Sequence, residues 1–166
     1  MNKVVVLGGG YGGQMVVQEL LKQMPDGSRI VLVDRMPYQG LKTEYYALAA
    51  GTVSDLEIRV NFPVHPQLQM VYGNVTEIDL ENKIVRVSRQ EPVSYDSLVI
   101  ALGCTDNYHG IPGAAEHACS IQSLSATRRT FQQINDIRPY GQLTIVGGGL
   151  SGVEVAAELR ESRADI

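Results

Sequence analysis

A glycine turn near the N-terminus constrains the fold of this chain more than any other feature. Gly8, Gly10 and Gly13 are spaced as G-x-G-x-x-G, directly after the apolar run of residues 4–7 and directly before a helical pattern. In nucleotide-binding turns of this kind, the first glycine allows the tight turn and the second lets the backbone approach a pyrophosphate. The third lets the helix pack close to the strand. The pattern therefore predicts a strand, a phosphate-binding turn and a helix.

The helical pattern leads into a second apolar run, which completes a βαβ unit. Apolar residues recur at four-residue steps over residues 16–24, and the apolar run of residues 30–33 follows. Residues 98–102 and 143–146 form two further runs of this kind. Uninterrupted apolar runs are typical of parallel strands that are covered on both faces, and the crossover between the first two is expected to be right-handed.

The middle of the chain has a different pattern. Residues 68–87 carry three short strand-like runs, VYG, VTEIDL and KIVRV, divided by turn residues. They predict an antiparallel meander inserted before the third parallel strand. A helical segment over about residues 123–135 follows, and then a linker at residues 139–141. The predicted fold class is α/β, a Rossmann-like parallel sheet with an inserted antiparallel β-meander.

Composition narrows the function classes. The net charge of −4 over 166 residues gives no basic surface for nucleic acid, and no apolar run is long enough for a membrane span. The two cysteines, Cys104 and Cys119, have no CxxC or zinc spacing and are expected to be free, partly buried thiols. The three histidines also lack ligand spacing, so no metal site is predicted. A cytoplasmic protein is expected.

Candidate cofactor-binding residues surround the first turn. Asp34 ends the second apolar run, where an acid accepts hydrogen bonds from ribose hydroxyls. Arg35 beside it either covers an adenine face or is solvated. Tyr11 and Gly12 lie within the turn at the helix N-terminus, where N–H groups and the positive end of the helix dipole favour an anion. We predict dinucleotide binding here rather than an ordinary glycine-rich turn.

A second glycine motif follows the apolar run of residues 143–146. Gly147, Gly149 and Gly152 repeat the G-x-G-x-x-G spacing, and a helical pattern with Val153 on its apolar face follows. The second strand and the terminal acid that would hold a ribose do not follow. We therefore expect the motif to be genuine but unable to bind a dinucleotide in this chain.

The two motifs together resemble flavoproteins with two dinucleotide-binding domains. Two further stretches carry the resemblance: SYDSLVIALG at residues 94–103 is similar to the YDxLVIATG stretch of that superfamily, and GIPG follows at residues 110–113. The resemblance implies that FAD binds at the first motif and NAD(P)H at the second. It also places Ala101, Leu102 and Gly103 beside the flavin phosphates.

Within that superfamily the chain most resembles type II NADH dehydrogenases, which are NADH:quinone reductases. Disulfide reductases carry a CxxxxC at the place of residues 38–51, and this chain has no cysteine there. Dithiol exchange at that place is therefore excluded. The resemblance places Lys42 and Thr43 near the flavin, the backbone of Val75 near adenine, and Glu154 near the flavin–nicotinamide junction. The alternative for Glu154 is a solvent-facing helix residue.

The resemblance implies a domain division and a function. We expect the N-terminal part of an FAD-binding domain over residues 1–113, a connecting helix and linker over 114–141, and the start of a truncated NADH-binding domain over 142–166. The expected function is an FAD-dependent oxidoreductase that passes hydride from NADH to flavin and electrons to a quinone, impaired in this truncated form. Its full-length form is expected to contact the cytoplasmic face of the membrane peripherally. A non-catalytic dinucleotide-binding fragment, another pyridine-nucleotide flavoprotein reductase and a stand-alone NAD(P)-binding regulatory domain stay open as alternatives.

One expectation concerns the run at residues 143–146, which has lost the sheet of its own domain. We expect it to pair as a strand beside residues 98–102, within one chain or exchanged between the two chains of a homodimer. The helix from Leu150 would then cover one face of the sheet. An unpaired sheet edge would otherwise invite aggregation or strand addition.

Overall fold

The computed structural model describes residues 2–166. The chain divides into two compact units, and each is described by itself. The first unit extends to Gln39 and continues over Val60–Gly103, and the second comprises Gly40–Arg59 and Cys104–Ile166. The chain thus passes three times between the units. The functional division expected from the sequence stays a prediction.

The first unit is built on a four-stranded parallel sheet. Its strands are β1 (Lys3–Leu7), β2 (Arg29–Asp34), β5 (Leu68–Tyr72) and β9 (Ser97–Ile100), in the order β5-β2-β1-β9. Helix α1 (Tyr11–Gln23) connects β1 to β2 and confirms the predicted βαβ unit. The α/β fold class is confirmed.

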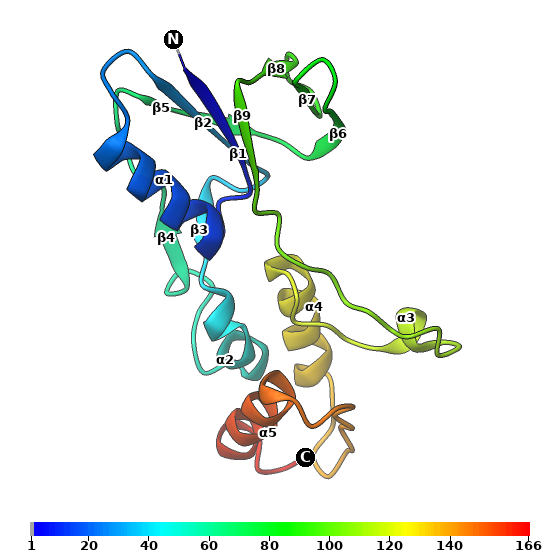
Figure 1. Ribbon diagram of the computed structural model, residues 1–166. Helices are drawn as coiled ribbons and strands as arrows, with labels where there is room; N and C mark the ends of the chain where they lie inside the picture. Colours follow the sequence, from blue (N-terminus) through cyan, green and yellow to red (C-terminus); the bar gives the residue numbers. More distant parts are fainter. Residues whose placement is uncertain (1) are drawn as a thin grey trace. The chain divides into compact units, whose positions relative to one another are not determined.

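Alternating residues of the central strands supply two separate apolar cores. Val4, Val6, Ile30 and Leu32 pack with Val17 of α1 on one face. The opposite face packs against the antiparallel sheet of β6 (Val75–Asp79), β7 (Ile84–Val87) and β8 (Val93–Ser94). The buried residues of this second core are Val5, Leu7, Val31, Val33, Val85, Val87, Val93 and Tyr95. Figure 1 shows α1 and the β6-β7-β8 sheet against the parallel strands. Because both faces of β1 and β2 are covered, their side chains need not alternate between apolar and polar.

Two sequence predictions about this unit were wrong in part. The run that contains Val71 belongs to β5 and pairs parallel to β2, so it is not the first strand of the meander. The run at residues 98–102 was expected to be covered on both faces, but β9 is an edge strand and Ile100 is 60% exposed. A short apolar run does not specify which strand it will pair with. The pairing of β5 and the edge position of β9 depend on the tertiary structure.

The second unit is helical. Its elements are the 3₁₀ turn η1 (Lys42–Glu44) and the helices α2 (Tyr45–Ala50), α3 (Ala114–His117), α4 (Leu124–Asn135) and α5 (Leu150–Ser162). Ser123 caps α4 by accepting a hydrogen bond from the N–H of Ala126 at 3.2 Å, as expected of a serine at this position. The predicted helix at residues 123–135 is thus confirmed. Strands β3 (Tyr38–Gly40) and β4 (Arg59–Asn61) pair with one another where the chain passes between the units.

The predicted strand at residues 143–146 does not form. Leu143 instead packs into an apolar cluster around Ala50, Ile134 and Leu159. These three residues come from α2, α4 and α5, which lie close together in Figure 1. Helix α5 likewise packs on α2 and covers no sheet. The expected pairing with residues 98–102 was therefore wrong: Leu143 packs on the helices instead, and Val146 stays 91% exposed.

The apolar face predicted for α5 was also wrong. Val153 was predicted to lie on that face, but its side chain is 57% exposed. The buried side of α5 carries Leu159, and the half-buried Val155 packs against the same cluster. No helix within residues 2–166 is both long and apolar enough to cross a membrane.

Candidate functional site

The first glycine turn requires glycine at Gly8 for two reasons. Its φ of +97° lies in the left-handed region that L side chains rarely adopt. A Cβ at Gly8 would also lie 2.3 Å from the carbonyl oxygen of Ala101, which is a clash. The backbone holds this approach, because the N–H of Gly8 donates to Val33 at 2.8 Å and the N–H of Ala101 donates to Leu7 at 2.8 Å. The end of β9 is thus fastened against the turn.

In the rest of the turn, Gly13 is closely packed, whereas Gly10 has free space around it. A Cβ at Gly13 would lie 1.8 Å from the carbonyl oxygen of Gly8, so α1 begins in contact with the turn. Gly10, by contrast, has no atom within 4 Å of that position, and Gly12 has only the Cβ of Ala101 at 3.9 Å. Gly10 caps α1 without a side-chain hydrogen bond. A backbone cradle with an open glycine at a helix N-terminus fits a pyrophosphate.

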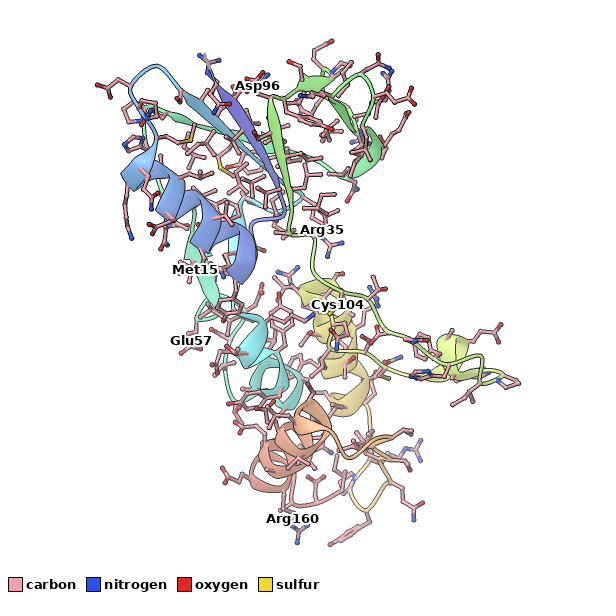
Figure 2. All side chains as sticks on the ribbon, in the orientation of Figure 1. Met15, Arg35, Glu57, Asp96, Cys104 and Arg160 are labelled. Carbon is pink, nitrogen blue, oxygen red and sulfur yellow. The ribbon has the colours of Figure 1, made fainter. Side chains whose placement is uncertain are left out.

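Asp34 lies beside this turn, at the end of β2. Its Oδ2 accepts a hydrogen bond from the N–H of Gly9 at 2.6 Å, and its Oδ1 accepts one from the N–H of Met36 at 2.8 Å. The carboxylate is half-buried. Arg35 is exposed and is labelled beside the end of the sheet in Figure 2. The acid predicted to contact a ribose is therefore held in place by the glycine turn itself.

The other predicted residues of the first unit lie on neighbouring elements. Val75 begins β6, opposite Val87, and packs against the core beneath the sheet. Ala101, Leu102 and Gly103 continue from β9, with Leu102 54% exposed and Gly103 at a φ of +79°. The first unit thus brings Gly8, Gly12 and Ala101 together, and Gly9 together with Asp34.

Sequence reasoning missed three residues at this turn. A Cβ on Gly9 would meet the ring of Phe62 at 2.5 Å, so the buried Phe62 covers the turn. The run of three consecutive glycines, with Gly9 in the middle, was the signal for Gly9. No sequence signal pointed to Phe62. Gln14, in the first turns of α1, is only 6% exposed, and its amide atoms have no hydrogen-bond partner among the described residues.

The second glycine motif lies in the second unit and shares only part of the geometry of the first turn. Gly147 has a φ of +106°, and a Cβ on Gly152 would lie 2.6 Å from the carbonyl oxygen of Gly147, as at the first turn. Gly149 caps α5 and has open space around it. Val146, however, is 91% exposed and belongs to no strand. The turn and helix are present without the strand that should precede them.

Lys42 and Thr43 lie in η1, and both are exposed. The Lys42 ammonium donates a hydrogen bond to the Cys104 sulfur at 3.4 Å, within the second unit. Cys104 and Cys119 are both free and exposed, so the expectation of partly buried thiols was wrong. Cys104 lies in the irregular segment between β9 and α3, and Cys119 lies between α3 and α4.

Glu154 is half-buried on α5 rather than fully solvent-facing. The pKa of Tyr46 on α2 is raised chiefly by the negative charge of Glu44, then by desolvation, and further by Glu158 and Glu154. Glu158 also accepts a hydrogen bond from the hydroxyl of Thr52. The acidic side of α5 therefore lies against α2 and the segment that follows it.

A comparison with known protein families decides the classification. The model of a family described as "Pyridine nucleotide-disulphide oxidoreductase" matches residues 2–166. The chain belongs to this family.

Individual members of the pyridine nucleotide-disulphide oxidoreductase family agree with this. The chain is 53% identical over 167 residues to the NADH dehydrogenase-like protein YutJ of Bacillus subtilis, covering 100% of this chain and 47% of that protein. It is 31% identical over 176 residues to the type II NADH:quinone oxidoreductase of Staphylococcus epidermidis, covering 96% of this chain and 43% of that one. The chain spans less than half the length of these two relatives.

A solved structure shows the same fold. NDH2 from Plasmodium falciparum, in complex with NADH, superimposes with a TM-score of 0.77 at 22% sequence identity, over 95% of this chain and 36% of that one. The assignment to an oxidoreductase family with a Rossmann-like fold, made from the sequence, is therefore confirmed.

Proposed function

We propose that this chain forms the FAD-binding part, and the beginning of the NADH-binding part, of a type II NADH dehydrogenase. The reaction of such an enzyme passes hydride from NADH to FAD and electrons onward to a quinone. Support comes from the family match over residues 2–166 and from relatives named as NADH dehydrogenase-like and as type II NADH:quinone oxidoreductase. The absence of a cysteine over residues 38–51 argues against a dithiol mechanism at that place.

The observation that carries the proposal is the open side of the first glycine turn. Gly10 presents bare backbone to open space at the N-terminus of α1, and no side chain competes for that position. In the proposal the FAD pyrophosphate lies against Gly10, Tyr11 and Gly12, where the helix dipole stabilises negative charge. Gly8 and Gly13 are proposed to shape the turn that holds the cofactor.

The remaining residues of the first unit are proposed to orient the cofactor. Asp34 accepts hydrogen bonds from the adenosine ribose, and Arg35 covers the adenine. The backbone of Val75 contacts adenine, and Ala101, Leu102 and Gly103 flank the phosphates. The fixed position of the Asp34 carboxylate supports the proposed contact with the ribose, because the N–H groups of Gly9 and Met36 hold this carboxylate at the turn.

The second unit is proposed to contribute Lys42, Thr43 and Glu154 toward the flavin, and Gly147, Gly149 and Gly152 toward the NADH pyrophosphate. Bound FAD would supply the capacity to accept hydride, whereas the protein supplies position and electrostatics. We propose that NADH oxidation is impaired in the 166-residue chain, because residues 143–146 form no strand and no strand follows α5 up to Ile166. Strand exchange between two chains is no longer part of the proposal, since it required that strand.

Quinone and peripheral membrane contact are proposed for the intact enzyme only. Both follow from the name of the type II NADH:quinone oxidoreductase relatives, of which this chain spans less than half.

Absorbance spectroscopy of the purified chain, before and after reconstitution with FAD, tests the proposal. A retained flavin spectrum after gel filtration, with measurable flavin reduction by NADH, supports the dehydrogenase assignment. Failure to retain FAD at any concentration, in a chain that circular dichroism shows to be folded, would overturn it.

A non-catalytic dinucleotide-binding fragment is the second candidate, and the missing strand at residues 143–146 favours it. The same experiment separates the two. Bound flavin that NADH does not reduce, while dithionite does, supports the non-catalytic fragment.

A further inference from the structure

Two residues distant in the sequence, Lys42 and Cys104, place an amine against a thiol on the surface of the second unit. The Nζ of Lys42 lies 3.4 Å from the Sγ of Cys104, and both side chains are exposed. Figure 2 labels Cys104 next to the N-terminal end of α4. Within residues 2–166, Lys42 is the one lysine whose side chain contacts a sulfur.

Backbone hydrogen bonds hold the turn that carries Lys42, and the Cys104 side chain has a second contact of its own. Leu41 donates its N–H to Ile58 at 2.8 Å, and Glu44 donates to Leu41 at 2.9 Å, which fixes the η1 turn that carries Lys42. The Cys104 thiol donates to Gln122 at 3.7 Å.

The segment that follows Cys104 is fastened as well. The hydroxyl of Ser120 donates to Asp106 at 2.6 Å, and Thr130 of α4 donates its hydroxyl to the carbonyl of Ser120 at 2.8 Å. The amine and the sulfur therefore meet on two anchored segments, which gives their reaction a high effective concentration.

Cys119 offers a contrast within the same chain. It is exposed as Cys104 is, but its thiol donates to the amide oxygen of Gln133 at 2.7 Å and has no lysine beside it among the described residues. The chain has only these two cysteines. Lys42 is thus the chemical difference between two otherwise similar thiols.

We propose that Lys42 and Cys104 form a peroxide-sensitive pair that closes to a sulfenamide, a covalent S–N link. Hydrogen peroxide first oxidises the Cys104 thiol to a sulfenic acid and is itself reduced to water. The Lys42 amine, in its neutral form, then attacks the sulfenyl sulfur. The S–N bond forms, the S–O bond breaks, and the departing hydroxide takes the amine proton to give a second water.

The link is reversible and protects the sulfur. Two thiol molecules cleave the S–N bond, regenerate the Cys104 thiol and the Lys42 amine, and leave as a disulfide. While the link exists, Cys104 cannot proceed to the irreversible sulfinic and sulfonic acids. It also removes the positive charge of Lys42 and ties η1 to the segment that leaves the first unit. This regulation goes beyond the proposed dehydrogenase function and does not depend on bound FAD.

Mass spectrometry of the peroxide-treated 166-residue chain tests the proposal. The variant Cys119→Ser leaves Cys104 as the sole thiol, and Cys104→Ser is the matched control that leaves Cys119. We expect Cys119→Ser to lose the mass of two hydrogen atoms, to resist tryptic cleavage after Lys42, and to yield a peptide that joins Lys42 to Cys104. A thiol reductant should restore both the mass and the cleavage.

Lys42→Arg in the Cys119→Ser background keeps a positive charge but removes the primary amine, so the cross-linked peptide should be lost and Cys104 should accumulate sulfinic acid. Cys104→Ser should give no cross-link and should oxidise Cys119 irreversibly. Three results would overturn the inference: irreversible oxidation of Cys104 at the rate of Cys119, a Cys104–Cys119 disulfide as the wild-type product, or a link whose mass includes an added oxygen atom.

Discussion

The carboxylate of Asp34 accepts a hydrogen bond from the backbone N–H of Gly9 at 2.6 Å. This contact joins the end of β2 to the glycine turn that follows β1, across 25 residues of sequence. It fixes the acid at the turn, so that the group proposed to bind the ribose and the turn proposed to bind the pyrophosphate form one surface. Preorganisation of this kind lowers the entropy cost of binding.

Replacing Asp34 by Ala should weaken binding of ADP or FAD by about 1–3 kcal/mol, because the half-buried carboxylate proposed to accept hydrogen bonds from the ribose is lost. Isothermal titration calorimetry with ADP measures the change. Asp34→Asn is the matched control, since its amide oxygen still accepts the Gly9 hydrogen bond and should retain part of the affinity. Equal ADP affinity in wild type and Asp34→Ala would reject the ribose assignment.

Gly10→Ala and Gly13→Ala should separate binding from folding. A methyl group at Gly10 meets open space and an ordinary backbone conformation, so its effect on the free energy of unfolding should stay within about 0.5 kcal/mol. It should lower FAD affinity about tenfold or more, or about 1.4 kcal/mol, by blocking the approach of the pyrophosphate.

The Gly13→Ala methyl group would clash with the carbonyl of Gly8, and overpacking there should cost about 1–3 kcal/mol of stability. Urea denaturation followed by circular dichroism, together with FAD titration, measures both variants. The prediction fails should Gly10→Ala unfold the chain, or should it bind FAD as wild type does.

Asp55 should make the stability of the second unit sensitive to acid. Its carboxylate accepts hydrogen bonds from Arg59 and, at 2.6 Å, from Arg128 of α4. Desolvation raises the pKa of Asp55, but the hydrogen bonds and charges of the two arginines outweigh it, and the pKa lies below its usual value. The folded state therefore binds the proton less readily than the unfolded state does.

The stabilisation from Asp55 is accordingly present above the unfolded pKa of about 4 and is lost as the pH falls through the lower folded pKa. Asp55→Asn should reduce stability at pH 7 by about 1–3 kcal/mol, and the difference from wild type should shrink at lower pH. Urea denaturation across that pH range measures it. Asp165, whose pKa is lowered chiefly by hydrogen bonds from Arg163, is a second acid for comparison. A difference that is independent of pH would contradict the assignment.

NADH should bind weakly to the isolated chain, with a Kd of about 1 mM or higher, which corresponds to about −4 kcal/mol. Gly147, Gly149 and Gly152 form a turn at the start of α5, but no strand precedes it and none follows up to Ile166 to orient the ribose. NADH fluorescence titration measures the affinity, with Gly149→Ala as a control for binding at this turn. Saturable binding at much lower concentrations that Gly149→Ala abolishes would disprove the prediction.

The sequence predicted those parts of the fold whose cause is local. A G-x-G-x-x-G turn depends on a positive φ at Gly8 and on the close approach of Gly13 to the Gly8 carbonyl, and both follow from residue type and spacing. The helix predicted at about residues 123–135 and the βαβ unit are local in the same sense. The second turn shows this most clearly, because Gly147 and Gly152 repeat the geometry without any adjacent strand.

Only the tertiary structure decided which element each apolar segment pairs with or packs against. An apolar run does not say which neighbour will cover it, so β5 joined the parallel sheet and residues 143–146 formed no strand. Leu143 packs against α4 and α5 instead of entering a sheet, and the hydrophobic effect has no directional preference between these two kinds of neighbour. The contacts of Phe62 with Gly9 and of Lys42 with Cys104 join residues far apart in sequence, and only the folded chain brings them together.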